Sequence, residues 1–356
     1  MTGIRDLARH LDISIGTVSR ALNDRVGVNA ETRDRVREAA ARLGYSPNQS
    51  GRSLRRGKTD LVAVIVPTGG DRTLIRPVFL SVLDGLRRHL FEQRLDLSIF
   101  LHGPDEPLFG SVRRLTERGL VDGLIIANTQ HVDPRIDYLI ERRQPFVAFG
   151  RSLSGGDHPW VDPDFAHAVE SSVEMLYEFG HRKIALMLPI GETHYLHLIL
   201  DAYRAAMKKR GLTIEPHFAQ RQRADEAGGF AAGEALLGAK TRPTAIITSE
   251  EFQRFGLYRK LNEAGVRPER DISIIGVLPE ERVNILSPAL TTFQTEWTAI
   301  GVRLGEALTT AMGRPPSALP DQPSKASPSS ISVPAIQSIM PVALRPGDSV
   351  HRVTER

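Results

Sequence analysis

Two segments near the start of the chain decide the fold of its N-terminal part: IRDLARHLDISIGTVSRALND (residues 4–24) and VNAETRDRVREAAARLGYSPN (residues 28–48). In the first segment apolar residues recur from Ile4 at steps of three and four, which is the spacing of one helix face. The pattern breaks after Leu11, and Ser14 then stands where a side-chain oxygen caps a second helix through IGTVSRALN. The segment predicts two short helices joined by a tight turn.

A third helix is predicted after Asn29, which is a favourable N-cap residue, and Gly44 is placed to end it. Four apolar residues of this helix are expected in the core: Val36, Ala39, Ala40 and Leu43. Two short helices and a third supporting helix form a helix-turn-helix, whose second helix enters the major groove of DNA. Periodicity alone is equally compatible with a small helical bundle of another function.

Charge is distributed unevenly along the 356 residues. Residues 1–58 contain 12 Lys and Arg against 6 Asp and Glu, and residues 59–356 contain 34 against 36. The first part therefore carries a formal charge of +6, and the remainder carries −2. A small basic module joined to a nearly neutral body predicts contact with a polyanion such as DNA.

The two N-terminal segments closely resemble the start of the LacI/GalR family of bacterial transcription regulators, through TVSRALN (residues 17–23) and the later LGYSPN (residues 43–48). The resemblance implies that Val18 and Ala21 are buried while their neighbours face DNA. The implied DNA-binding residues of the module are Ser14, Ile15, Gly16, Thr17, Ser19, Arg20, Asn23, Asn29, Thr32, Arg33 and Tyr45. The resemblance also implies a homodimer, in which each module reads one half of a near-palindromic operator.

The basic segment NQSGRSLRRGKT (residues 48–59) has the composition of a linker, except for its apolar Leu54. By position it matches the family's hinge helix, in which Leu54 would be inserted into the central minor-groove step of the operator. The DNA-binding residues implied here are Asn48, Ser50, Gly51, Arg52, Leu54 and Arg55. Because glycine disfavours a helix interior by about 1 kcal/mol, Gly51→Ala is predicted to tighten operator binding. Leu54→Ala is predicted to lower specific affinity while sparing nonspecific binding.

The rest of the chain alternates apolar runs, interpreted as buried parallel strands, with amphipathic stretches, interpreted as helices. The expected strands are LVAVIVPT (61–68), LDLSIFL (95–101), VDGLIIAN (121–128), QPFVAFGR (144–151), RKIALMLP (182–189), PTAIITSE (243–250) and DISIIGV (271–277). The expected helices lie near residues 77–93, 108–118, 134–143, 165–179, 196–210, 225–238 and 251–264. This alternation predicts an α/β fold with doubly wound parallel sheets.

The phrases VDGLII, FGHRKIALM, LNEAGVRPERDISIIGV and SPALTTFQ resemble the family's effector domain. The resemblance implies a periplasmic-binding-protein-like architecture, in which two lobes hold a ligand between the carboxyl ends of their strands. We expect a DNA-binding domain at residues 1–46, a hinge helix and linker at 47–59, and an effector-binding and dimerisation domain at 60–356. The first lobe is expected at about 60–160 and 291–324, and the second at about 161–290 and 325–346.

The expected ligand cleft departs from that of sugar-binding family members. An acidic pair of those members corresponds to Leu278 and Pro279, and an arginine corresponds to Ile199. Each lost charge-assisted hydrogen bond is worth about 1.5 to 3 kcal/mol, so a neutral sugar is less secure as the ligand. The candidate effector-binding residues are Arg151, Trp160, Asp164, His194, Tyr195, Glu250 and Leu278.

These candidates also have structural interpretations. Arg151 can pair with an acid across the cleft, His194 and Tyr195 can be exposed loop residues, and Glu250 can begin a helix, where an acid suits the dipole. No catalytic, nucleotide-binding or metal-binding pattern is found, so neither an enzyme nor a cofactor is predicted. The Pro- and Ser-rich segment at residues 313–337 is predicted to be an exposed loop.

The absence of cysteine excludes disulfides, and no apolar run reaches the roughly 18 residues of a membrane-spanning helix, so a cytoplasmic protein is expected. We predict a DNA-binding repressor that acts as a homodimer under the control of a small-molecule effector, which is a sugar, sugar acid or sugar phosphate. Two alternatives stay open. One is an effector-blind regulator with a degenerate cleft, and the other is a cytoplasmic small-ligand-binding α/β protein whose basic N-terminus binds another anion.

Overall fold

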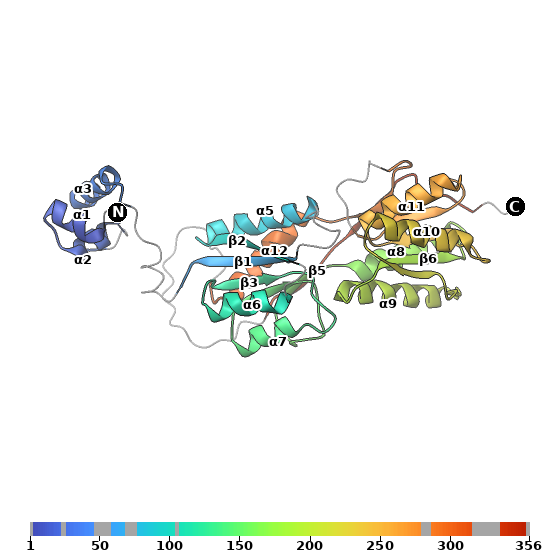
Figure 1. Ribbon diagram of the computed structural model, residues 1–356, viewed down its shortest axis with the longest axis horizontal. Coiled ribbons are helices and arrows are strands. Elements are labelled where there is room, and N and C mark those ends of the chain that lie inside the picture. Colours follow the sequence, from blue (N-terminus) through green and yellow to red (C-terminus); the bar gives the residue numbers. More distant parts are fainter. Residues whose placement is uncertain are drawn as a thin grey trace. The chain divides into compact units, whose positions relative to one another are not determined.

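The computed structural model describes residues 3–22, 26–45, 58–67, 77–103, 107–278, 286–314 and 335–353. The chain forms two compact units, residues 1–59 and residues 60–356 (Figure 1). Several predicted DNA-binding residues lie outside the described residues: Asn23, Asn48, Ser50, Gly51, Arg52, Leu54 and Arg55. Within the described parts of the chain, no helix is long and apolar enough to cross a membrane.

The N-terminal unit contains the three predicted helices, α1 (Ile4–Leu11), α2 (Ile15–Leu22) and α3 (Ala30–Arg42). Their buried apolar side chains form one small core: Leu7, Ala8, Val18, Ala21, Val36, Ala39 and Ala40. Leu43, which was predicted to be buried, is only half-buried at the edge of this core because it follows the last helical residue. Gly44 has a φ of +61°, the left-handed conformation that ends a helix and that glycine adopts without a steric penalty.

The second unit begins with a six-stranded, all-parallel sheet in the order β11-β5-β4-β3-β1-β2. Its strands are β1 (Leu61–Pro67), β2 (Asp96–His102), β3 (Gly123–Ile126), β4 (Phe146–Phe149), β5 (Trp160–Pro163) and β11 (Gln337–Met340). Val64 of the interior strand β1 pairs with Ile99 on one side and Ile125 on the other. Branched apolar residues suit such a strand because both faces of a parallel sheet are covered.

Four helices cover this first sheet: α5 (Pro77–Glu92), α6 (Leu108–Glu117), α7 (Pro134–Glu141) and α12 (Trp297–Ala311). Helices α5 and α12 share one apolar cluster with the sheet, and α6 and α7 share another (Figure 1). A Cβ added at Gly85 would lie 2.0 Å from the carbonyl oxygen of Thr298, and one at Gly301 would lie 2.0 Å from that of Val82. Only glycine therefore permits the close approach of α5 and α12, which brings a late segment of the chain back to the first lobe.

The second sheet has the order β12-β10-β9-β8-β6-β7, with β12 antiparallel to β10. Its strands are β6 (Ile184–Pro189), β7 (Ala219–Gln222), β8 (Ala245–Thr248), β9 (Ser273–Gly276), β10 (Thr291–Gln294) and β12 (Ala343–Arg345). The helices are α8 (Phe165–Glu178), α9 (His194–Lys209), α10 (Glu226–Gly238) and α11 (Glu251–Glu263). Helices α8 and α9 pack on one face, and α10 and α11 pack on the other.

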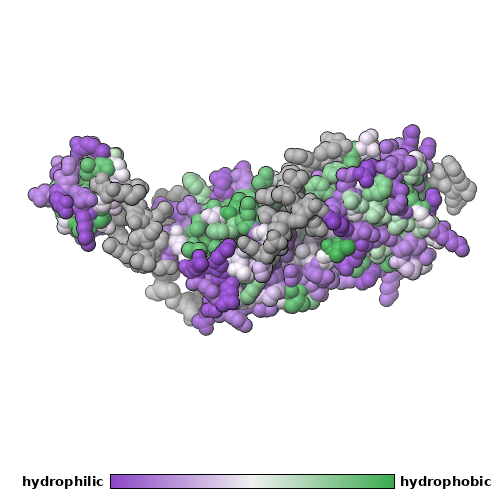
Figure 2. All heavy atoms as spheres, viewed as in Figure 1, coloured by the Kyte–Doolittle hydropathy of each residue, from purple (hydrophilic) through white to green (hydrophobic). Residues whose placement is uncertain are grey.

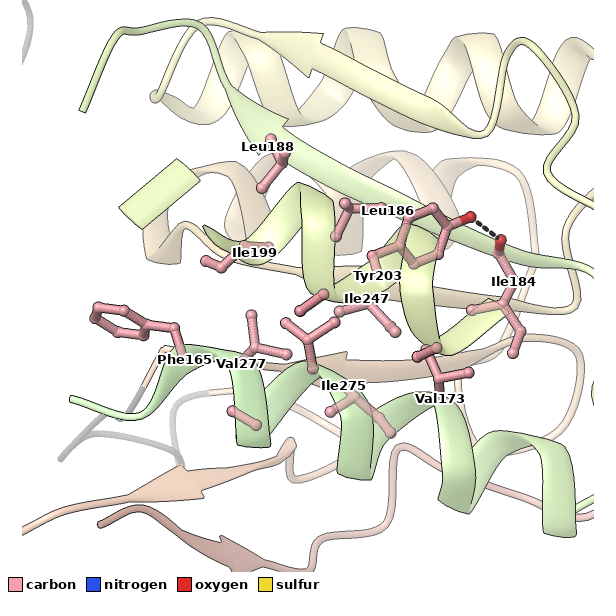
Figure 3. Close-up of a cluster of buried hydrophobic side chains, with 14 of the residues drawn as sticks. Phe165, Val173, Ile184, Leu186, Leu188, Ile199, Tyr203, Ile247, Ile275 and Val277 are labelled. Carbon is pink, nitrogen blue, oxygen red and sulfur yellow. Dashed lines mark hydrogen bonds between the residues drawn. The ribbon is translucent and has the colours of Figure 1, made fainter. Parts of the chain in front are cut away.

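Figure 3 shows the apolar cluster between α8, α9 and the second sheet. Tyr203 of α9 is fully buried there, and its hydroxyl donates a hydrogen bond of 2.7 Å to the carbonyl oxygen of Ile184. Burial raises the pKa of this hydroxyl above its ordinary value of 10. The Tyr203 hydroxyl is thus hydrogen-bonded to a carbonyl oxygen of β6, and the tyrosine ring fills the core.

Among the described residues the chain crosses between the lobes three times, and two of the expected boundaries are wrong. Strand β10 (Thr291–Gln294) lies in the second sheet, and β11 (Gln337–Met340) lies in the first, whereas we expected the opposite lobe for each. The crossovers fall at Asp164, at residues 295–296 and at residues 341–342. The physical reason is that each of these strands ends at its crossover, so that the chain changes lobe after the strand and not before it.

The remaining differences concern short or polar elements. The pattern gave no strand at β5 (WVDP) or β7 (AQRQ), because neither has an apolar run. His194 and Tyr195 were expected as possible loop residues, but they form the first turn of α9. Strand β12 follows β11 after two residues, so the terminal phrase SIMPVALRP supplies one strand to each lobe.

Candidate DNA-binding and effector-binding sites

The first turns of α2 and α3 are fixed by side-chain caps. The Ser14 hydroxyl accepts a hydrogen bond of 3.0 Å from the backbone N–H of Thr17, and the Asn29 side-chain Oδ1 accepts one of 2.8 Å from the backbone N–H of Thr32. Such caps satisfy helix N–H groups that have no partner within the helix. The sequence pattern located both helix starts, and the two capping residues, Ser14 and Asn29, therefore have a structural role whether or not they also contact DNA.

Helix α2 has one buried face and one exposed face. Val18 and Ala21 are fully buried against the other two helices. On α2 and at its N-cap, four of the predicted DNA-binding residues are exposed: Ser14, Ile15, Gly16 and Arg20. Ile15 is 45% exposed although it is a large apolar side chain at the start of a helix. An apolar group in that position can contact a thymine methyl in the major groove, and an arginine can contact guanine or phosphate.

Other predicted DNA-binding residues are less accessible. Thr17 and Ser19 are half-buried on α2, and Tyr45 packs against the small core. Arg33 is half-buried, and its Nη2 donates to the carbonyl oxygen of Val28 at 3.4 Å. The structure therefore separates an outward-facing group on α2 from residues that also support the module.

At the carboxyl end of β4, Arg151 pairs with a buried acid that the sequence did not single out. Its Nε lies 2.8 Å from Oδ2 of Asp162, and its guanidinium carbon lies 5.6 Å from the centre of the Trp160 ring. Burial raises the pKa of Asp162 to about 6, although the Arg151 charge opposes this shift. Nη2 of Arg151 is buried and has no hydrogen-bond partner among the described residues. Arg151 therefore pairs with an acid as predicted, but Asp162 belongs to the same lobe and not to the opposite side of the cleft. The pairing leaves Nη2 of Arg151 able to donate to another group.

Asp164 and Tyr195 also have identifiable structural contacts. The Asp164 carboxylate caps α8 by accepting a 3.0 Å hydrogen bond from the His167 N–H, and the Asp164 N–H donates to the Met340 carbonyl oxygen of β11. The Tyr195 ring lies 5.7 Å from that of Phe165. Both predicted residues therefore lie where the chain passes from the first lobe to the second.

Residues 129–131 of the first lobe and residues 192–194 of the second form a short antiparallel bridge, which we call the interlobe bridge. The His194 N–H donates to the Thr129 carbonyl oxygen at 2.9 Å, and the His131 N–H donates to the Glu192 carbonyl oxygen at 3.0 Å. The two imidazoles meet with their Nδ1 atoms 2.9 Å apart. Sequence reasoning missed His131, and its only signal is a histidine shortly after an apolar strand.

A buried ion pair holds the first-lobe half of the interlobe bridge. Asp133 and Arg135 are almost fully buried, with Oδ2 and Nη2 2.5 Å apart. Arg135 also donates to the carbonyl oxygens of Ala127 and Asn128, and the Asp133 carboxylate accepts from the Gln130 N–H at 3.0 Å. Arg135 and these N–H groups keep the pKa of Asp133 below its ordinary value despite its burial. The segment that reaches the second lobe is thus rigidly supported.

The other two candidates, Glu250 and Leu278, follow strands of the second sheet. Glu250 is buried at the N-cap position of α11 without capping it by a side-chain hydrogen bond. Leu278 and Ile199 are buried in the apolar cluster of Figure 3, where Ile199 is drawn. Neither of these two positions presents a polar group to a ligand. In the part of the chain that the structure describes, no group of three or more His, Asp or Glu side chains could hold a metal ion.

The protein combines a helix-turn-helix module with a two-lobed α/β domain of the kind that binds small ligands. This combination is that of a ligand-controlled class of transcription regulators. Residues 3–48 match the model of bacterial regulatory proteins of the lacI family, and residues 173–332 match that of the periplasmic binding protein-like domain. The HTH-type transcriptional regulator AglR of Rhizobium meliloti (strain 1021) is 32% identical over 313 residues, covering 86% of each chain. The protein therefore belongs to the LacI family of bacterial transcriptional regulators.

Two further similarities agree with this assignment. The ribose operon repressor of Escherichia coli (strain K12) is 27% identical over 295 residues, covering 82% of this chain and 87% of that protein. The lac repressor dimer bound to operator and the anti-inducer ONPF matches the fold with a TM-score of 0.82 at 20% identity, covering 98% of this chain and 99% of that chain. These relatives are transcriptional regulators and not enzymes, as predicted for this chain.

Proposed function

We propose that this LacI-family regulator is a cytoplasmic repressor that binds a near-palindromic operator as a homodimer. In this proposal the exposed face of α2 reads the major groove, and a sugar or sugar-derived effector binds between the lobes and controls the affinity for DNA. The observation that carries the proposal is the face of α2 on which Ile15, Gly16 and Arg20 are exposed while Val18 and Ala21 fill the core. The lac repressor, whose fold is similar, is a dimer bound to operator.

An exposed apolar surface on the first lobe supports the homodimer. Leu80 and Phe91 on α5 are 58% and 76% exposed, and Ile99 and Leu101 on the neighbouring edge strand β2 are 46% and 61% exposed. Figure 2 shows hydrophobic side chains on the face of this lobe that carries α5. An apolar surface beside an unpaired strand edge is suited to contact with a second copy of the chain. We propose that this surface forms part of the dimer interface.

The effector is proposed to lie near Arg151, whose buried Nη2 needs an acceptor, with Trp160 as an adjacent ring surface. A hydroxyl or carboxylate oxygen would supply that acceptor, which fits sugars and sugar acids. Among the relatives, the ribose operon repressor takes its name from a sugar operon. Glu250 is a further buried acid after β8 that could accept hydroxyl hydrogen bonds. Leu278 is proposed only as an apolar lining residue.

DNA binding is tested by fluorescence anisotropy. The full-length protein is titrated into labelled DNA from upstream of the gene at several salt concentrations. Arg20→Ala is expected to weaken specific binding by about 10- to 100-fold, as expected for loss of a base or strong phosphate contact. Arg118→Ala is the matched control, because it removes an exposed arginine from the other unit. Equal affinity of the wild-type protein for the upstream DNA and an unrelated duplex would reject the proposal.

Effector control is tested separately by thermal unfolding with neutral sugars, polyols, sugar acids and sugar phosphates. A ligand at 100 times its Kd stabilises the folded protein by about 2.7 kcal/mol, which shifts the melting temperature measurably. Arg151→Gln should abolish the shift produced by any active compound. Operator binding without a shift by any compound would favour the alternative of an effector-blind regulator.

A further inference from the structure

The interlobe bridge carries a group of three histidines that the proposed function does not use. The His131 ring, from the loop after β3, contacts two rings of α9: its centre is 5.0 Å from that of His194 and 4.0 Å from that of His197. The planes are inclined by 23° and 21°, so the three rings form a stack that crosses from one lobe to the other. We propose that this stack is a proton-sensitive latch, which holds the lobes together when the His194 imidazole is neutral and releases the interlobe bridge when it is protonated.

The geometry of the stack is incompatible with protonation of both His131 and His194. With Nδ1 of His131 and Nδ1 of His194 2.9 Å apart, one nitrogen must donate and the other must accept. If both rings are protonated, two N–H groups face each other and the hydrogen bond is lost. His194 is also only 6% exposed, so a charge on it is poorly solvated.

The charged and titratable groups around His194 mostly oppose its protonation. Burial is the largest cause that lowers its pKa, followed by the neighbouring His131, Arg151 and His197, and together they bring it to about 4. Asp201, one turn further along α9, acts in the opposite direction. The Glu192 carboxylate lies 3.8 Å from Nε2 of His197, but its side chain is 79% exposed, so solvent screens its charge.

The direction of the pH effect follows from this comparison. When the interlobe bridge separates, water reaches His194 and its pKa returns towards the ordinary value of about 6.5. The separated arrangement therefore binds more protons than the bridged one between pH 6.5 and pH 4. The ratio of separated to bridged molecules should rise by up to about tenfold for each pH unit below 6.5, and it should be independent of pH above that value.

The latch is connected to the surroundings of Arg151 by hydrogen bonds within the first lobe. The carbonyl oxygen of His131 accepts bonds from the Leu153 N–H at 2.9 Å and the Ser152 hydroxyl at 3.2 Å. Both donors directly follow Arg151 in the chain. A shift of His131 on release would therefore be transmitted to the segment that carries Arg151, although the latch itself requires neither DNA nor an effector.

Amide hydrogen exchange of the full-length protein tests the latch directly. Exchange is measured by mass spectrometry at pH 7.5 and pH 5.5 and corrected for the intrinsic rate at each pH. Peptides that contain residues 129–133 and 192–197 report the bridge bonds of the His131 and His194 N–H groups. We expect about tenfold lower protection of these peptides at pH 5.5, with unchanged protection of the β8 strand (Ala245–Thr248).

Two variants separate the latch from a general effect of acid. His194→Gln, which removes the buried titrating ring, should lose the pH dependence, whereas His167→Gln, an exposed histidine on α8, should keep it. If His194→Gln lowers protection of β8, the same measurement is made with His131→Gln. Equal protection of the wild-type bridge at both pH values would overturn the latch, and so would an undiminished pH dependence in both bridge variants.

Discussion

The N-terminal module and the interlobe bridge both present polar side chains, but they are built in opposite ways. In the module, the buried face and the exposed face of α2 are both formed by the same eight consecutive residues, Ile15–Leu22. In the bridge, His131 and His194 are 63 residues apart and come from different lobes. The comparison shows that a helix face is determined by local spacing, whereas the bridge exists only if two separate sheets fold and dock correctly.

The largest effect is expected where the small core of the module is disrupted. Val18→Asp places a charge without a partner at a fully buried position. This lowers the free energy of unfolding of the module by on the order of 3 to 5 kcal/mol, which is expected to unfold a core of this size. Hydrogen exchange should show loss of protection in α1, α2 and α3, with no change in the strands of residues 60–356. The matched variant Ile15→Asp lies at an exposed position on the same helix and should retain protection. Loss of protection in both units would contradict independent folding.

Removal of the support beneath the interlobe bridge should have the next largest effect. Arg135→Ala leaves the buried Asp133 carboxylate without its counter-ion, at a cost of about 3 to 5 kcal/mol. We expect a lower free energy of unfolding in urea and faster exchange at residues 129–131. Arg142→Ala removes an arginine that is 55% exposed at the end of the same helix, and it should change stability by less than about 1 kcal/mol. Comparable decreases of the free energy of unfolding in the two variants would contradict a stabilising role of the buried Asp133–Arg135 pair.

A smaller effect is expected from His181, a fully buried histidine whose Nδ1 lies 3.0 Å from the Thr244 hydroxyl. Burial lowers the pKa of His181 to about 4, below its ordinary value of 6.5. The unfolded chain therefore binds more protons between these values, and stability falls as the pH decreases from 6.5 towards 4, by about 3 kcal/mol in total. Urea unfolding of His181→Gln should show a smaller decrease over this window than the wild type does. A decrease as large as that of the wild type would exclude His181 as the cause.

The smallest effect on folding is expected for Gly16→Ala. A Cβ at Gly16 would lie 3.6 Å from the Ser14 hydroxyl oxygen, an ordinary contact, so the stability should change by no more than about 1 kcal/mol. Operator affinity should nevertheless fall, because the α2 backbone is proposed to approach DNA there. The control is Gly85→Ala, whose Cβ would meet the Thr298 carbonyl oxygen at 2.0 Å and which should lower the melting temperature clearly. Unchanged operator affinity of Gly16→Ala would remove this residue from the proposed interface.

The sequence by itself determined the three N-terminal helices with their caps, the class of the fold and most strands, because apolar periodicity and cap residues act over a few neighbouring positions. Ser14 and Asn29 cap the helices for which the pattern proposed them. The short strand β5 and the polar strand β7 were not found, because what makes them strands is pairing with neighbours and not their own apolar content.

Tertiary structure alone decided the partners of the candidate effector residues. Arg151 pairs with Asp162 on the adjacent strand, and His131 meets His194 across the lobes. It also decided to which sheets β10 and β11 belong. The physical reason is the same in each case: these contacts join residues of different strands or lobes, and their energies depend on burial and docking geometry, which no local pattern encodes.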